Sequence, residues 1–196
     1  KWFHFFMYMI ILAIDPGLKN LGWAVYDSSK SCFLSFGRYN LLKGHPKKMH
    51  TKYAFLVKSF VDASRDVFEA ADKICIEIQM TAKFKVIATA FQCFFWDRAE
   101  LVSPRSVRCH FKISTGNYAK NKKASIAIVP TLEIPLKNKQ WFHSFDKSKR
   151  DDVADAMLLA LYWNNVKLKT ETKKRKRPKT SKPRKRRKTS SNIIEN

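Results

Sequence analysis

Carboxylate side chains stand at three places in the sequence where a metal-dependent reaction would need them. Asp15 ends an apolar run, and Glu77 lies inside a β-branched segment. Asp152 and Asp155 precede the strongly apolar stretch AMLLALYW. Acidic side chains are almost never buried without a partner, so acids in apolar surroundings indicate a bound cation. Oxygen ligands of this kind suit Mg²⁺, with Mn²⁺ able to substitute.

Each acid taken alone also has a structural explanation. Asp15 precedes a Pro-Gly pair and could be a turn or cap residue. Glu77 could face water from an edge strand, although glutamate is disfavoured in strands. Negative charge is favourable at a helix N-terminus, which could explain Asp151 and Asp152. That interaction explains Asp155 poorly, because it lies one turn deeper on the same helix face as Asp152.

Acids at three positions on separate elements of one basic chain are better explained by phosphodiester hydrolysis. Two divalent ions about 4 Å apart can clamp a scissile phosphate and stabilise both the attacking and the leaving oxygen. No serine or tyrosine motif for a covalent intermediate is evident in the sequence, so water is the expected nucleophile. The residues therefore predict a metal-dependent nuclease with two ions per site.

The charge of the chain indicates a polyanionic partner. The 39 Lys and Arg residues against 16 acids give a formal net charge of +23. Residues 173–196 hold 12 of these basic residues and one acid, so the preceding part is basic as well. Nucleic acid is the first candidate for such a protein and an anionic membrane surface the second. The apolar start, KWFHFFMYMIILAI, is shorter than the ~20 residues of a membrane span, so no membrane role is expected.

The elements that must position the acids follow from the apolar patterns. Three strands at residues 9–14, 21–26 and 32–39 form a meander, and the turns between them are polar. Alternating helices and strands follow, and a last helix carries the two aspartates. This order predicts an α/β fold, with a mixed five-stranded sheet flanked by helices. The remaining expected segments are helices at 46–70, 81–96 and 149–163, strands at 73–79 and 101–104, a basic loop at 114–123 and an unassigned stretch at 124–135.

Three sequence segments resemble the RuvC-type Holliday junction resolvases. ILAIDPGLKNLGWAVYD resembles their first hairpin, and KRDDVADAMLLAL resembles their final helix. CIEIQ resembles their second acidic strand, in the form found in fungal mitochondrial and poxvirus-type enzymes. The resemblance covers residues 9–163. It implies an RNase H-like fold, a homodimer, and paired symmetric nicks across a four-way DNA junction.

The resemblance also assigns roles by position. Asp15, Glu77, Asp152 and Asp155 match the catalytic metal-binding tetrad, whereas Asp151 falls outside the motif. Gln79 matches the family only in pattern, and no role is assigned to it. The nuclease domain is expected to span residues 1–166, and residues 167–196 are expected to be a disordered basic tail. The tail could bind DNA or act as a nuclear import signal, which would place the protein in a host nucleus or at a viral replication site.

Basic and aromatic residues near the acids predict two further surfaces. The helix at 81–96 carries more aromatic residues than one buried stripe needs, and the resemblance implies that its surplus face forms the dimer interface. Ordinary solvated surface is an equally good explanation for any single basic residue. As a set, the following residues are expected to contact DNA phosphates: Lys83, Lys85, Arg105, Arg108, Lys120, Lys122 and Lys123.

Two alternatives to a junction resolvase remain open from the sequence. One is another RNase H-like nuclease, acting on flaps or RNA-containing substrates. The other is a basic DNA-binding or packaging protein without catalytic activity, in which the acids are helix caps and the tail binds DNA. Buried acids would give such a protein no advantage, so the nuclease interpretation is preferred.

Overall fold

The computed structural model describes residues 8–170. Most of the predicted basic tail lies outside this range, as do the first seven residues of the apolar start. The last helix continues to Thr170, beyond the predicted domain boundary at residue 166. In the described part of the chain, no helix is both long and apolar enough to cross a membrane.

A five-stranded mixed sheet forms the centre of the fold, as predicted. The strand order is β3-β2-β1-β4-β5. The first three strands pair antiparallel as a meander, whereas β4 and β5 run parallel to β1. The strands are β1 (Ile10–Asp15), β2 (Leu21–Asp27), β3 (Cys32–Tyr39), β4 (Lys73–Glu77) and β5 (Ala99–Val102).

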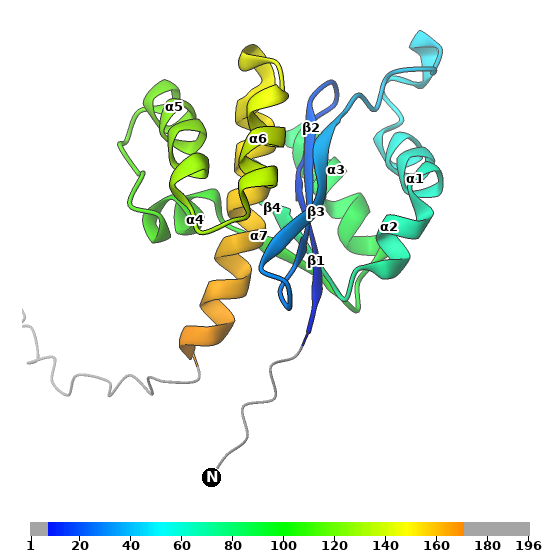
Figure 1. Cartoon of the computed structure of the whole chain (residues 1–196). Helices are drawn as coiled ribbons and strands as arrows, with labels where there is room; N and C mark the ends of the chain where they lie inside the picture. Colours follow the sequence, from blue (N-terminus) through cyan, green and yellow to red (C-terminus); the bar gives the residue numbers. More distant parts are fainter. Residues whose placement is uncertain (1–7, 171–196) are drawn as a thin grey trace, which may run out of the picture.

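Helices cover both faces of the sheet (Figure 1). One face is covered by α1 (Tyr53–Ala63), α2 (Arg65–Ala70) and α3 (Ala82–Phe94). The other carries α4 (Pro104–His110), α5 (Tyr118–Ile128), α6 (Leu136–Ser144) and α7 (Arg150–Thr170). Single 3₁₀ turns are η1 (Lys47–Met49), η2 (Val129–Thr131) and η3 (Lys147–Lys149).

The start of α7 lies against β2 at a glycine. A Cβ atom added to Gly22 would come within 2.1 Å of the main-chain oxygen of Asp152. Only a residue without a side chain therefore allows this close approach. The rest of the helix buries an apolar stripe on the sheet, including Val153 and Met157, which are both fully buried. This packing fixes where the acidic first turns of α7 lie relative to β1.

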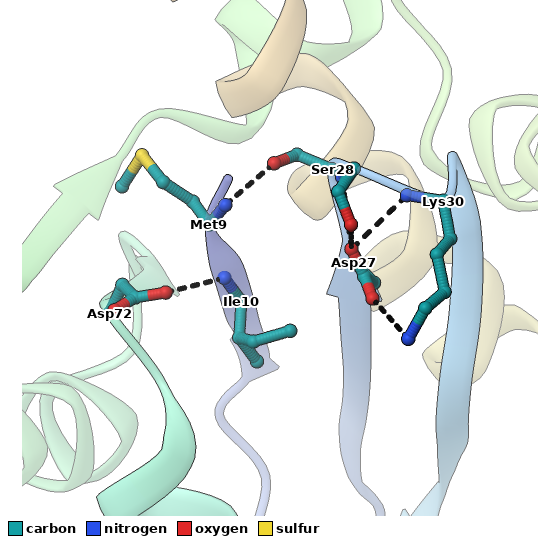
Figure 2. A network of polar contacts seen from close by, with 7 residues as sticks. Met9, Ile10, Asp27, Ser28, Lys30 and Asp72 are labelled. Carbon is teal, nitrogen blue, oxygen red and sulfur yellow. Dashed lines mark hydrogen bonds and ion pairs between the residues drawn. The ribbon is translucent and has the colours of Figure 1, made fainter. Parts of the chain in front are cut away.

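Polar contacts on both sides hold the N-terminal end of β1 (Figure 2). The amide of Met9 donates to Ser28 Oγ at 2.8 Å, and the amide of Ile10 donates to Asp72 Oδ2 at 2.7 Å. Ser28 follows β2 and Asp72 precedes β4, so β1 is fixed between its two neighbouring strands. Because Ile10 lies at this end of the sheet, Asp15 at the other end of β1 lies at the opposite end of the sheet.

Several predicted elements differ from the structure. The loop expected at 114–123 is wrong from Tyr118 onward, because α5 begins there and the Asn117 side chain accepts a hydrogen bond from the amide of Lys120. Lys120, Lys122 and Lys123 are therefore helical. The helix expected at 46–70 is interrupted at Ser64, between α1 and α2. Besides α5, two further helices were not predicted, α4 and α6.

Candidate active site

Two of the four predicted acids lie at the ends of adjacent parallel strands. Asp15 is the last residue of β1 and Glu77 is the last residue of β4. The strands pair in register up to Ile14 and Ile76, so both carboxylates emerge at the same edge of the sheet. Ligand sites in open α/β sheets lie at these carboxyl ends. An apolar run followed by one acid therefore corresponds here to a buried strand whose last residue lies at this edge of the sheet.

The first turns of α7 bring the other two acids to the same place. Asp152 and Asp155 line one cavity of about 410 Å³ together with Asp15 and Glu77. The structure thus brings together all four acids that the sequence singled out. Asp151, which falls outside the predicted tetrad, does not line this cavity. We call the cavity the carboxylate pocket.

Burial and mutual repulsion disfavour the charged form of these acids. Burial raises the pKa of Glu77 to about 8, and the negative charge of Asp155 adds to this rise. Burial and then the charge of Glu77 raise the pKa of Asp15 well above its ordinary value. The pKa of Asp152 is raised to about 6, first by burial and then by Asp151. The positive charge around the four acids is therefore too small to keep all of them ionised.

Nearby cations supply part of that charge. Lys122 on α5 forms an ion pair with Asp151, and its Nζ lies 4.0 Å from Asp152 Oδ1. Ser125, one turn further along α5, hydrogen-bonds Asp155 and is almost fully buried. Helix α5 therefore presents one face to the acids of α7. Neither Ser125 nor the role of Asp151 as the partner of Lys122 was predicted from the sequence.

Gln79 joins the two acids of the strand ends. Its Nε2 donates to Asp15 Oδ1 at 2.9 Å and to Glu77 Oε1 at 3.1 Å. The two hydrogens of the amide thus satisfy two carboxylates that otherwise repel each other. The sequence signal was the spacing of Gln79 two residues after Glu77, which turns both side chains to the same side of an extended chain.

The acids fit a divalent cation by the chemistry of their donor atoms. Partly buried carboxylate oxygens with raised pKa values are hard ligands in need of positive charge. Within residues 8–170, however, no group of three or more His, Cys, Asp or Glu side chains is close enough to hold a metal ion as it stands. The donor set is present, and its side chains would have to move closer together to coordinate an ion.

Comparison with known proteins identifies the family. A family model described as Poxvirus A22 protein matches residues 9–167, a range that includes all four acids. The chain belongs to the poxvirus A22 protein family. No curated protein sequence matches the chain.

Solved structures agree with this assignment. The chain is similar to the fowlpox virus resolvase in its complex with substrate Holliday junction DNA, with 21% identity, a TM-score of 0.61, and coverage of 82% of this chain and 100% of that one. It is also similar to the yeast mitochondrial Holliday junction resolvase, with 15% identity, a TM-score of 0.64, and coverage of 82% and 81%. The predicted RuvC-type, RNase H-like fold is confirmed for this poxvirus A22 family member.

The predicted DNA-contacting residues of this A22 family chain fall into two groups. Lys83, Arg108 and Lys122 line the carboxylate pocket. The other four predicted residues lie on the exposed surface outside the pocket: Lys85, Arg105, Lys120 and Lys123. The first group therefore lies beside the four acids, and the second lies outside the cavity that contains them.

Replacing Gln79 by leucine is expected to destabilise the metal-free protein by about 1–3 kcal/mol, the cost of leaving partly buried polar groups unpaired. Gln79→Leu keeps the approximate size of the side chain but removes the donor between Asp15 and Glu77. Urea unfolding in the presence of a chelator measures the change. Gln140→Leu, on the exposed side of α6, is the matched control. Equal stability of the two variants would show that the hydrogen bonds of Gln79 contribute nothing.

Proposed function

We propose that this protein is a structure-selective endonuclease that resolves four-way DNA junctions by paired, metal-dependent phosphodiester hydrolysis. The main support for the proposal is that four acids from β1, β4 and α7 line one pocket together with basic residues. The solved structures of this fold reported above are Holliday junction resolvases, one of them bound to its junction substrate. A branched duplex is therefore the substrate class best supported.

Asp15, Glu77, Asp152 and Asp155 would hold the metal, with Mg²⁺ as the expected ion, Mn²⁺ as its substitute and two ions per site. Such ions, when bound, activate a water molecule and stabilise the leaving oxygen. The protein's own side chains orient the substrate. Lys122 and Arg108 would bind the phosphate, and Gln79 would keep the two strand-end acids in place before the metal binds.

Paired cuts require two active sites, and α3 is the proposed dimer interface. Phe91 packs in the core, but Val86, Phe94 and Trp96 are 48%, 42% and 80% exposed. A surface with this much exposed apolar and aromatic area is typical of a protein–protein contact. The exposed aromatic residues of this segment, Phe94 at the end of α3 and Trp96 just beyond it, support the proposed interface.

Two other functions would use the same fold. A nuclease for flaps or RNA-containing substrates would need the same acids, and only the choice of substrate separates it from a resolvase. A packaging protein without activity would need only basic surface. The raised pKa values of the pocket acids favour a catalytic role over packaging, because strongly perturbed groups collect at functional sites.

The test is cleavage of a substrate panel. Purified protein is incubated with Mg²⁺ and end-labelled four-way junction, flap, linear duplex or RNA–DNA hybrid. We expect symmetric cuts near the branch point of the junction and little cleavage of linear duplex. Preferential cutting of flaps or hybrids would support the alternative nuclease. Absence of cleavage on every substrate with either Mg²⁺ or Mn²⁺ would contradict the enzymatic function.

A further inference from the structure

A second hollow, of about 490 Å³, adjoins the carboxylate pocket. The two share Lys19 and Asn20, which belong to the turn between β1 and β2. Its other charged lining residues are Arg38, Lys43 and Lys149, and no acid lines it. We call it the basic hollow. None of its four cations was among the DNA contacts predicted from the sequence.

The four cations come from separate segments that the fold brings together. Arg38 lies near the end of β3, and Lys43 lies in the loop that follows it. Lys149 ends η3, directly before α7. A charge cluster assembled from distant segments is a property of the folded protein and is independent of any basic run in the sequence.

The basic hollow is tied to the active site through the sheet. Arg38 pairs with Gly22 across β3 and β2, and Gly22 is the residue on which the start of α7 rests at Asp152. The Arg38 guanidinium is oriented by Asn20, whose Oδ1 accepts a hydrogen bond from Nη1 at 3.2 Å. A guanidinium fixed at one edge still presents other N–H groups to a ligand.

The positive charge of the basic hollow is compensated only in part within the described residues, where Arg38 lies near enough to Asp152 to oppose the rise of its pKa. In the range 8–170 none of Lys19, Arg38, Lys43 and Lys149 forms an ion pair with an acid. Lysines on the surface of this protein elsewhere do find acids, as Lys58 does with Asp62. Four unpaired cations facing one hollow repel one another, so an anion would stabilise the arrangement.

We propose that the basic hollow binds backbone phosphates of the cleaved DNA strand, next to the phosphate held in the carboxylate pocket. This inference rests on the proposed function. Successive phosphates of one strand are only about 3.4 Å apart along the helix axis, so a strand entering one hollow must continue into its surroundings. Arginine binds phosphate through paired N–H groups and lysine through its charge, and neither reads the bases.

The test is the salt dependence of junction binding by the full chain, measured with a chelator present so that no cutting occurs. Arg38→Gln and Lys43→Gln are each expected to lower the slope of log K against log salt by about 1, the contribution of one phosphate contact. Lys30→Gln is the control, because Lys30 lies in the turn between β2 and β3 at the opposite edge of the sheet. It should leave the slope unchanged.

The outcomes separate this inference from the proposed function. If wild type cuts junctions but the Arg38 and Lys43 variants keep the wild-type slope, the basic hollow is not a DNA contact. If the slopes fall but no DNA is cut, the basic hollow stands and the nuclease function fails. Titration with inorganic phosphate tests whether the basic hollow binds free phosphate instead of the phosphates of DNA. Tight phosphate binding that Arg38→Gln abolishes, together with an unchanged slope for DNA, would also overturn the proposal.

A second measurement locates the contact along the strand. Neutral methylphosphonates replace single phosphates within about three nucleotides of the branch point. At one or two positions, the replacement should weaken binding by wild type several-fold and have no further effect on the Arg38→Gln/Lys43→Gln variant, as expected for groups in contact. Additive losses at every position would contradict a phosphate held in the basic hollow.

Discussion

Asp155→Asn is expected to abolish junction cleavage while leaving junction binding intact. Asparagine keeps the shape of the side chain but removes the charge that would hold a divalent ion. A bound metal contributes several kcal/mol to the stabilisation of developing charge. Since each 1.36 kcal/mol corresponds to a factor of ten, the single-turnover rate should fall by about 10³-fold or more. Binding should not weaken, because a negative charge near the phosphate is removed.

Single-turnover cleavage of a labelled junction measures the first effect, and gel-shift titration measures the second. Asp66→Asn is the matched control, because Asp66 is exposed on α2, away from the carboxylate pocket. The control should cut at the wild-type rate. Wild-type activity in Asp155→Asn would remove Asp155 from the catalytic site, and loss of binding in that variant would indicate a folding defect instead.

The metal-free protein is expected to become less stable as pH rises from about 5 to about 8. The pKa of Glu77 is raised from 4.5 to about 8 in the folded protein, so between these values the native state holds a proton that the unfolded chain has released. Under that condition the free energy of unfolding decreases with rising pH, and the decrease ends once Glu77 is ionised in the native state too. Asp15, Asp152 and Asp155 act in the same direction.

Glu77→Gln isolates this effect. The neutral side chain cannot lose a proton, so at pH 8 the metal-free variant should be more stable than wild type by about 2–4 kcal/mol. Urea unfolding with a chelator at several pH values measures the difference. The exposed Glu133→Gln is the control and should follow the wild-type curve. Parallel curves for wild type and Glu77→Gln would show that burial of this carboxylate is tolerated without cost.

The acids and the sheet could be predicted from the sequence because both leave local signals. An unbroken apolar run that stops at Asp15 describes a central strand and also the point where its side chain leaves the core. Glu77 stood out because its neighbours are apolar. Asp155 stood out because the charge lies in the buried part of a helix. In each case one residue contradicts the pattern around it, and that contradiction indicated a functional site.

Other parts of the site depend on contacts that no local pattern reports. Helix α5 was missed because its basic, weakly amphipathic sequence buries only Ser125, and its contacts with α7, such as the ion pair of Lys122 with Asp151, exist only in the assembled fold. Helix α6 was missed for a related reason. Asn138 on this helix is buried. Its side-chain oxygen accepts a hydrogen bond from the N–H of Phe33 on β3, and its side-chain nitrogen donates one to the C=O of Phe33. Such a side chain closes a sheet edge, which only the assembled fold reveals.

We propose that Asp15, Glu77, Asp152 and Asp155 form one metal site. Crystals of the full chain soaked in Mn²⁺, with anomalous scattering recorded, test it directly. We predict anomalous peaks within coordination distance of these four carboxylates, with Asp15 and Glu77 closer together than in the metal-free protein. The peaks should be absent from Asp155→Asn or reduced to one. Manganese bound elsewhere, with no peak in the carboxylate pocket, would contradict this account of the site.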